Sequence, residues 1–234
     1  MLDVSGLCSG YGSVPILRDV SFVAAPGSIT LIVGENGAGK TTLLRTIGGF
    51  LAPTGGSVTF DGQNLTGRKP EQIVEGGARL VLDGHRVFPG ISVWDNLRLG
   101  AVTRRDSTSF AEAAEEVFGL FPILKERRRQ PAGSLSGGQQ QMLALAQAFV
   151  GGPKLLMCDE PSLGLAQALM PPILQALSAW AERGMTVIVV EQYIDLVLPY
   201  AKQVIVFERG RIAQVSDAQT FSRSHDRKHQ TEPD

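Results

Sequence analysis

The sequence contains few cysteines, and they lie far apart. Cys8 and Cys158 are the only two among 234 residues. Cys158 falls inside an apolar run, which favours buried reduced thiols over a disulfide or a metal site. A small secreted scaffold held together by disulfides is therefore excluded.

Long apolar runs and an excess of charge of one sign are also missing. No apolar run reaches the roughly 18 to 20 residues of a membrane span, and the first residues lack the basic-then-apolar pattern of a signal peptide. The 22 basic and 23 acidic residues give a net charge of −1, so the composition gives no indication of nucleic-acid binding. We expect a cytosolic protein of one large domain with an inserted lobe, or of two small domains.

A glycine-rich turn is the most informative stretch that is present. It lies within ITLIVGENGAGKTTLLRTI, residues 29–47. Residues 29–33 form a β-branched apolar run, and apolar residues recur at helical spacing from Leu43 to Ile47, so a buried strand feeds a helix. In this context the G-x4-G-K-T pattern predicts a P-loop and disfavours an ordinary turn with an exposed lysine.

The P-loop predicts phosphate binding. Its glycines allow successive backbone N–H groups to approach an anion at the N-terminus of the helix. Lys40 is placed to reach the β- and γ-phosphates, and the Thr41 hydroxyl to ligate Mg²⁺. The predicted nucleotide-binding residues of this stretch are Gly34, Asn36, Gly37, Gly39, Lys40, Thr41 and Thr42.

Two adjacent carboxylates end another apolar run, KLLMCDE at residues 154–160. Such a run fits a strand that ends at the carboxyl edge of a parallel sheet, where α/β proteins bind ligands. Asp159 is then suited to the Mg²⁺ shell, and Glu160 to polarise a water for attack on the γ-phosphate. A solvated acid pair is the alternative, which the P-loop makes less favoured.

A second helix start also suits an anion. The segment LSGGQQQ, residues 135–141, opens a helical run. Ser136 is a good N-cap, and Gly137 and Gly138 leave the first-turn amides uncovered. A capped helix that binds nothing would not explain two adjacent glycines, each of which costs about 1 kcal/mol relative to alanine.

The remaining segments predict the organisation of the chain. Apolar alternation and turn residues indicate hairpins in residues 2–23, 56–65 and 204–215, and buried strands in residues 80–82 and 185–190. Residues 103–131 suggest amphipathic helices of a small lobe, and the basic run 125–129 is interpreted as a solvated helix end instead of a nucleic-acid patch. The tail after residue 221 is expected to be disordered.

These motifs resemble those of the ATP-binding subunits of ABC transporters. GENGAGKT, LSGGQ and LLMCDEP occur in the family's order and spacing, and the match covers nearly the whole chain. The resemblance implies an α/β fold with a P-loop NTPase core of mostly parallel sheet, an antiparallel β subdomain and an inserted α-helical lobe at about residues 84–150. It implies a single domain over residues 1–221, followed by the tail at 222–234.

The resemblance also implies ATP and Mg²⁺ as cofactors and a nucleotide sandwich dimer. Ser136 and Gly138 of one subunit would close on ATP that Lys40 and Thr41 of the other hold. Tyr11 lies in a predicted turn, where stacking on a purine and plain exposure are equally compatible with the sequence. The resemblance identifies it as the adenine-stacking residue.

Within the family, GENGAGKTT, GHRVFPGISVWDNLRLG, DEPSLGL and VEQ look most like the second ATPase subunit of branched-chain amino acid importers. Urea and short-chain amide importers are the runner-up. Three positions depart from the general pattern: Asp83 replaces a glutamine that contacts Mg²⁺, Gln192 replaces a γ-phosphate-sensing histidine, and Ala166 replaces an aspartate. The branched-chain subgroup typically has glutamate at the first position and glutamine at the second, so Gln192 is in keeping and Asp83 is one methylene shorter than expected. The resemblance assigns Asp83 to the metal site and Gln192 to catalysis.

The expected function is an ATPase that drives separately encoded membrane subunits. The expected partners are transmembrane permease subunits, a second ATPase subunit or a second copy of this chain, and indirectly an external solute-binding protein, with no nucleic acid. The expected location is peripheral, on the cytoplasmic face of the membrane. Alternatives are an ABC ATPase acting on DNA or ribosomes and a weakly hydrolysing regulatory subunit.

Overall fold

A six-stranded sheet forms the centre of the computed structural model, which describes residues 1–84, 87–104 and 108–229. The strand order is β10-β9-β3-β8-β7-β6, and every neighbouring pair is parallel except β10 and β9. The predicted mostly parallel core is therefore confirmed. The strands are β3 (Ser28–Val33), β6 (Ala78–Val81), β7 (Leu155–Asp159), β8 (Thr186–Val190), β9 (Gln203–Glu208) and β10 (Arg211–Asp217).

A second sheet of four antiparallel strands forms the predicted β subdomain. Its order is β2-β1-β4-β5, and the β1–β2 hairpin pairs Leu2 with Ala24 at one end and Tyr11 with Val14 at the other. The hairpins expected over residues 2–23, 56–65 and 204–215 are confirmed. The strands are β1 (Leu2–Tyr11), β2 (Val14–Ala24), β4 (Pro53–Phe60) and β5 (Gln63–Asn64).

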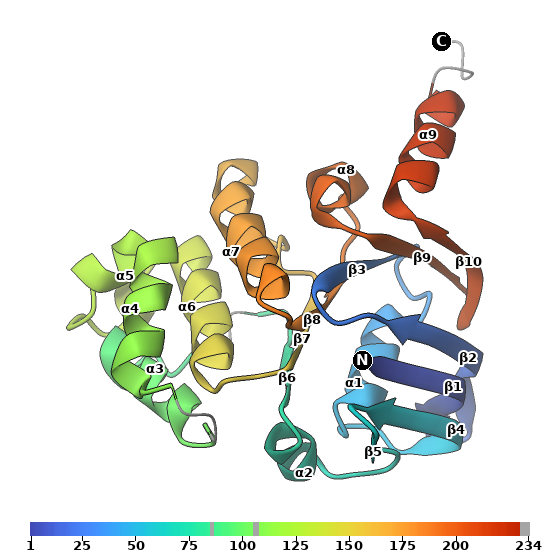
Figure 1. The fold of residues 1–234 in the computed structure, drawn as a ribbon, viewed down its shortest axis with the longest axis horizontal. Helices are drawn as coiled ribbons and strands as arrows, with labels where there is room; N and C mark the ends of the chain where they lie inside the picture. The colour runs from blue at the N-terminus through green and yellow to red at the C-terminus, as the bar shows by residue number, and fades with distance from the viewer. Residues whose placement is uncertain (85–86, 105–107, 230–234) are drawn as a thin grey trace.

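Helix α1 (Lys40–Ile47) fills the space between the two sheets (Figure 1). Its apolar face carries Leu43 and Leu44, which are fully buried and share a cluster with Ile32 of β3. Ile29 and Leu31 point to the opposite face of β3 and belong to the other core cluster, because successive residues of a strand alternate between its faces. The P-loop is thus anchored by core packing at both ends.

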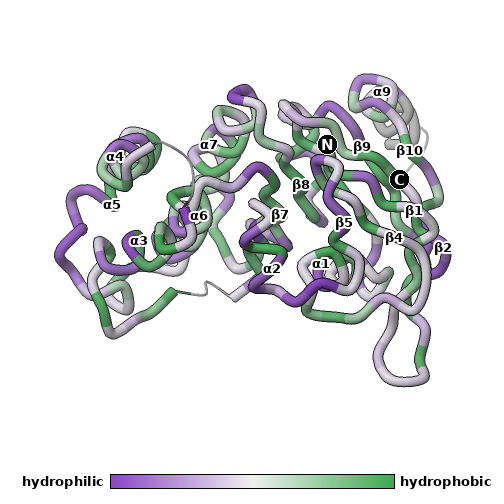
Figure 2. Tube along the Cα trace, turned by 60° about the horizontal axis from the view of Figure 1, so that its bottom comes forward, coloured by the Kyte–Doolittle hydropathy of each residue, from purple (hydrophilic) through white to green (hydrophobic). Residues whose placement is uncertain are grey.

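The other face of the central sheet is covered by helices, which Figure 1 shows on the left of the molecule. In Figure 2 the central strands β8 and β9 carry the hydrophobic colour, as expected for strands that are covered on both faces. The helices between α1 and residue 200 are α2 (Pro70–Glu75), α3 (Val93–Ala101), α4 (Phe110–Leu120), α5 (Pro122–Glu126), α6 (Gly137–Val150), α7 (Met170–Glu182) and α8 (Ile194–Val197), and short 3-10 turns occupy Ala132–Ser134, Gln167–Leu169 and Leu198–Tyr200.

The predicted helical lobe corresponds to α3 to α6. Residues 85–86 and 105–107, which fall within the segments predicted for this lobe, lie outside the described residues. The basic run 125–129 lies at the end of α5, where Arg128 and Arg129 are exposed and Lys125 pairs with Glu115 at 2.7 Å. This arrangement agrees with a solvated helix end.

The two cysteines are free in the structure. Cys158 is fully buried in β7, as predicted, and burial raises the pKa of its thiol far above the ordinary value. Cys8 is only half-buried, so the expectation of two buried thiols is wrong for Cys8. It lies on β1 beside a register shift of the β1–β2 pair.

The tail is not disordered where the structure describes it. Helix α9 runs from Ala218 to His229, so the prediction of disorder from residue 222 is wrong for residues 222–229, and residues 230–234 lie outside the described part. Ala218 and Phe221 are buried, and Asp217 accepts hydrogen bonds from the N–H and hydroxyl of Thr220 at 2.8 and 2.6 Å. Once a first turn is fixed, a polar sequence can continue as helix at little further cost.

Candidate nucleotide site

The backbone of the P-loop can be built only with glycine at two points. Gly34 has φ +156°, and a Cβ there would lie 2.1 Å from the carbonyl oxygen of Phe207 in β9. Gly39 has φ +109° and forms the N-cap of α1, where L side chains are strained. The loop therefore leaves its strand, turns against β9 and enters α1 in the conformation that the motif predicts.

Lys40 is the buried cation of the loop. Its residue is 4% exposed, and its Nζ donates hydrogen bonds to the carbonyl oxygens of Gly34 and Glu35 at 2.7 and 3.0 Å. Within the described residues no carboxylate forms an ion pair with it. A buried charge held only by backbone carbonyls favours binding of an anion, as its predicted role on phosphate requires.

Thr41 and Asp159 are brought together from α1 and β7, which are distant in sequence. The Thr41 hydroxyl donates to Oδ1 of Asp159 at 3.2 Å. Burial raises the pKa of Asp159 to about 6, a rise opposed by the Thr41 bond and by Arg45 and supported by the negative charges of Glu160 and Asp83. The two oxygen donors are of the type that Mg²⁺ prefers.

The metal site would be completed by other oxygens. Among the described residues no cluster of three or more histidines, cysteines or acids could hold a metal ion on its own. A P-loop site takes its remaining ligands from phosphate and water, so Thr41 and Asp159 fit Mg²⁺. Asp83 lies close enough for its charge to act on Asp159, and its role as a ligand stays a prediction.

Glu160 follows β7 in an unusual backbone conformation. Its φ of 46° lies in the left-handed region, which a residue other than glycine adopts only when its surroundings hold it there. Its N–H donates to the carbonyl of Val190 at 2.9 Å. Gln192, which follows β8, donates from Nε2 to Oε1 of Glu160 at 2.8 Å, so the structure brings the two predicted catalytic residues into direct contact.

Glu191 is a residue of this site that the sequence analysis missed. It is 1% exposed, and its carboxylate accepts bonds from the N–H and hydroxyl of Ser162, both at 2.7 Å, and from the N–H of Gln192 at 3.1 Å. Burial raises the pKa of Glu191 even though these bonds oppose the rise. The position of an acidic residue directly after an apolar strand could have pointed to Glu191. Its bonding partner Ser162, however, lies 29 residues away in the sequence.

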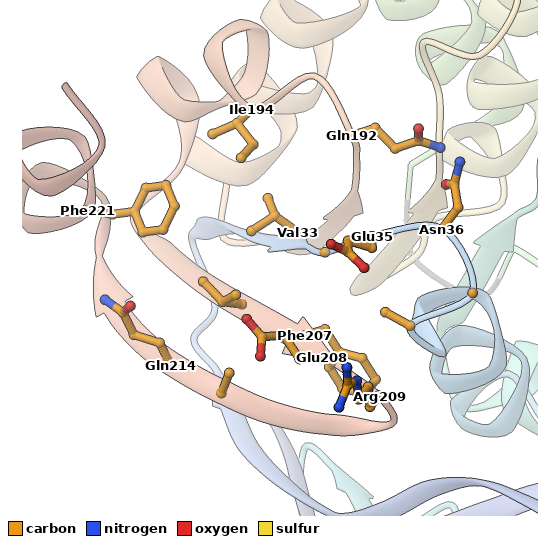
Figure 3. A pocket seen from close by; sticks show the side chains of 15 residues that line it. Val33, Glu35, Asn36, Gln192, Ile194, Phe207, Glu208, Arg209, Gln214 and Phe221 are labelled. Carbon is orange, nitrogen blue, oxygen red and sulfur yellow. The ribbon is translucent and has the colours of Figure 1, made fainter. Parts of the chain in front are cut away.

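A pocket of about 1020 Å³ borders the P-loop (Figure 3). Gln192 and Asn36 lie on one side of it, Ile194 and Phe221 on another, and Glu208 of β9 on a third. Lys40, Thr41 and Asp159 do not line it. Three of the predicted nucleotide-binding residues, Gly34, Asn36 and Gly37, do line it, so the pocket includes one side of the P-loop.

Tyr11 lies at the tip of the β1–β2 hairpin and is 46% exposed. The same hairpin packs against the P-loop, because a Cβ on Gly39 would lie 3.2 Å from Cγ2 of Ile16 in β2. The ring is thus accessible on an element that contacts the loop. Its role in stacking on adenine stays a prediction.

Ser136 and Gly138 lie at the start of α6, as predicted. Gln139 accepts a hydrogen bond from the N–H of Ser136 at 3.2 Å, as in a capping box. Gly138 is buried, and a Cβ there would lie 2.3 Å from Cδ1 of Leu169, the end of a flexible side chain in the segment before α7. The sequence analysis explained the glycines at this helix start by anion binding alone and did not predict the contact with Leu169.

The N-termini of α1 and α6, which are both predicted to bind phosphate, do not meet within one chain. Figure 1 places α6 in the helical lobe and α1 beside the β subdomain. Neither Ser136 nor Gly138 lines the pocket beside the P-loop. The contact between them that the sandwich dimer implies stays a prediction, because it needs a second subunit.

Comparison with known proteins places these motifs in context. A family profile described as ABC transporter matches residues 17–163. The chain is 39% identical over 212 residues to the high-affinity branched-chain amino acid transport ATP-binding protein BraG of Pseudomonas aeruginosa, covering 91% of each chain. It is 36% identical over 213 residues to the aliphatic sulfonates import ATP-binding protein SsuB of Zymomonas mobilis subsp. mobilis, covering 90% of this chain and 83% of that protein.

A solved structure supports the fold. A nucleotide-free ATP-binding cassette from an ABC transporter superposes with a TM-score of 0.85 at 25% identity, over 96% of this chain and 94% of that one. None of the helices in the described residues combines the length and apolar character that crossing a membrane requires.

Proposed function

This chain belongs to the ABC transporter family, and on that premise we propose that it is the ATP-hydrolysing subunit that powers import of branched-chain or other hydrophobic amino acids through separate membrane subunits. As an ABC ATP-binding subunit it is an ATPase. The observation that carries the assignment of its active site is the pairing of Thr41 with Asp159 beside the bonded pair Gln192 and Glu160.

The P-loop and Lys40 bind the phosphates. Backbone N–H groups at the start of α1 face the anion, and the Lys40 ammonium, held by Gly34 and Glu35, adds a fixed positive charge. Bound Mg²⁺, held by Thr41 and Asp159, supplies neutralisation of the phosphate oxygens. The substrate is thereby oriented with its γ-phosphate toward the carboxyl ends of β7 and β8.

Glu160 acts as the general base. Its carboxylate accepts a proton from a water molecule as that water attacks the γ-phosphate. Gln192 orients this carboxylate with one N–H, and its second N–H is free to donate to a γ-phosphate oxygen. An amide cannot supply the full charge of a protonated histidine, so stabilisation of the transferring group is weaker than with histidine.

The transported solute is inferred from resemblance. The 39% identity to BraG and the residues of the VEQ segment support branched-chain amino acids. The similarity to SsuB means that the ATPase subunit alone does not fix the solute. A urea or short-chain amide importer and a weakly hydrolysing regulatory subunit are the alternatives.

The proposed assembly places the chain on the cytoplasmic face of a membrane. It would bind transmembrane permease subunits there and pair with a second ATPase subunit, or with a second copy, across the nucleotide. Ser136 and Gly138 would then close on the phosphates that the partner's P-loop binds. An external solute-binding protein would deliver the solute.

Hydrolysis by the complex with its permease subunits tests this proposal. Glu160→Gln keeps the shape of the side chain and removes proton acceptance, so it should lower ATP hydrolysis by at least about a hundredfold while ATP still binds. Glu182→Gln, an exposed change on α7, is the matched control. Uptake of leucine, urea and an alkanesulfonate by proteoliposomes distinguishes the solutes, and hydrolysis at the parental rate by Glu160→Gln would contradict the proposed base.

A further inference from the structure

Glu191 is a buried carboxylate to which the proposed hydrolysis assigns no role. Three donors converge on it: the N–H and the hydroxyl of Ser162, each at 2.7 Å, and the N–H of Gln192 at 3.1 Å. Ser162 is itself 5% exposed, so the contact is shielded from water. Buried carboxylates are rare unless such bonds satisfy them.

The contact closes a ring of five residues, Glu160, Pro161, Ser162, Glu191 and Gln192. Ser162 stands two positions after Glu160, and Glu191 immediately precedes Gln192. One cross-link of the ring is the bond from Ser162 to Glu191, and the other is the bond from Gln192 to Glu160. The chain itself forms the two remaining sides, so moving either cross-link shifts the other.

The backbone of Glu160 needs such support. Its φ of 46° is unfavourable for a residue with a Cβ, and a strained conformation persists when its neighbours hold it in place. The strand-to-strand bond from Glu160 to Val190 fixes the near side of the turn. The bonds from Ser162 to Glu191 fix the far side.

We propose that Glu191 is a positioning residue for ATP hydrolysis: by clamping Ser162 it holds the turn that carries Glu160 in register with Gln192. This inference rests on the proposed function, in which Glu160 is the base. The choice of glutamate follows from chemistry, because only a carboxylate of this length offers two acceptor oxygens to Ser162 and a third bond to Gln192. A glutamine would present an amide N–H₂ group to one of these donors.

The first test is Glu191→Gln in the full chain with its permease subunits. We expect kcat to fall by at least about tenfold while the KM for ATP changes by less than about threefold, since a small displacement of a base affects the reacting geometry more than binding. Amide exchange at Ser162, followed by hydrogen exchange with mass spectrometry, should become faster. Glu182→Gln is the control: it makes the same change at an exposed carboxylate that accepts a hydrogen bond from the Ser178 hydroxyl, and it should change neither.

Ser162→Ala is the second variant, in case Glu191→Gln does not fold. It removes the hydroxyl bond and keeps the backbone bond, so we expect a smaller loss of kcat with the same unchanged KM. If both residues act through one contact, the loss in the double variant will be smaller than the product of the single losses.

A folded Glu191→Gln, or Ser162→Ala, with parental kcat would overturn the positioning role. So would losses of kcat and ATP affinity in equal measure, which indicate a general structural defect. Failure of the parent chain to hydrolyse ATP would instead overturn the proposed function, so the two failures are distinguishable.

Discussion

Gln192 donates a hydrogen bond from Nε2 to Oε1 of Glu160 at 2.8 Å, across the ends of β8 and β7. The bond joins a residue that would sense the γ-phosphate to the residue that would accept the proton. An amide has two N–H donors, so it can serve both neighbours at once. A water molecule beside this pair would be oriented by both side chains.

Gln192→Ala removes this bond and the donor to the phosphate. We expect kcat to fall by about a hundredfold to a thousandfold, the range seen when one donor to a transition state is removed, with little change in ATP affinity. Steady-state hydrolysis and fluorescent-nucleotide binding measure the two effects. Tyr193→Phe, a change at the exposed neighbour, is the control, and parental kcat in Gln192→Ala would assign catalysis to other donors.

Lys40→Ala should weaken ATP binding. Lys40 supplies a charge-assisted contact to phosphate that is worth about 1.5 to 3 kcal/mol, which corresponds to roughly a 10- to 150-fold loss of affinity. Isothermal calorimetry with Mg·ATP measures it. The control is Lys154→Ala, because Lys154 is exposed and only reaches Asp61 at 3.8 Å. Equal affinities of the parent and Lys40→Ala would refute the phosphate assignment.

The raised pKa of Asp159 predicts that the stability of the metal-free chain depends on pH. Its pKa rises from 3.8 to about 6 on folding, so the folded state binds a proton more tightly than the unfolded state. The protonated Asp159 carboxyl makes its full contribution to the free energy of unfolding below about pH 4. This contribution, about 3 kcal/mol, is lost as the pH rises through about 6. Above that pH the buried charge destabilises the fold.

Asp159→Asn should therefore be more stable than the parent at pH 7.5 and no more stable at pH 4. Urea unfolding without Mg²⁺ at both values measures the difference, and Asp3→Asn, an exposed change on β1, controls for surface charge. The lowered pKa values of Glu112 and Asp217 have the opposite sign, but they are common to both proteins and cancel in the comparison. A parent that is the more stable at pH 7.5 would show that Asp159 is favourably solvated.

The local pattern of the sequence was sufficient for most elements and for the P-loop. Period-two alternation and glycine-rich turns predicted the hairpins, and the apolar runs predicted β3, β7 and β8, because burial on one or both faces leaves a direct trace in the sequence. The pairing of Thr41 with Asp159 followed from the rule that ligands collect at the carboxyl edge of a parallel sheet.

Contacts that depend on side-chain packing were not predictable in the same way. The bond from Ser162 to Glu191 joins two turns, and no periodicity indicates which polar residues will face each other there. The approach of Leu169 to Gly138 likewise depends on how the segment before α7 meets α6. The helical start of the tail was missed because composition does not register a single buried anchor such as Phe221.

The last prediction concerns the partner of this chain. Gln192 cannot carry the charge of a histidine, and Asp83 adds negative charge close to Asp159, so each composite site formed by two copies of this chain would stabilise the transferring phosphoryl group weakly. A second ATPase subunit with histidine and glutamine at these positions would keep one of the two sites strong. We therefore expect the purified chain to be mainly monomeric and slow in hydrolysis, and to hydrolyse faster when the second subunit is added. Light scattering of Glu160→Gln with ATP, which traps closed dimers because hydrolysis is blocked, measures self-association directly. A tight ATP-dependent homodimer of this variant, together with rapid turnover by the parent chain alone, would show that Gln192 suffices and that two copies form the working pair.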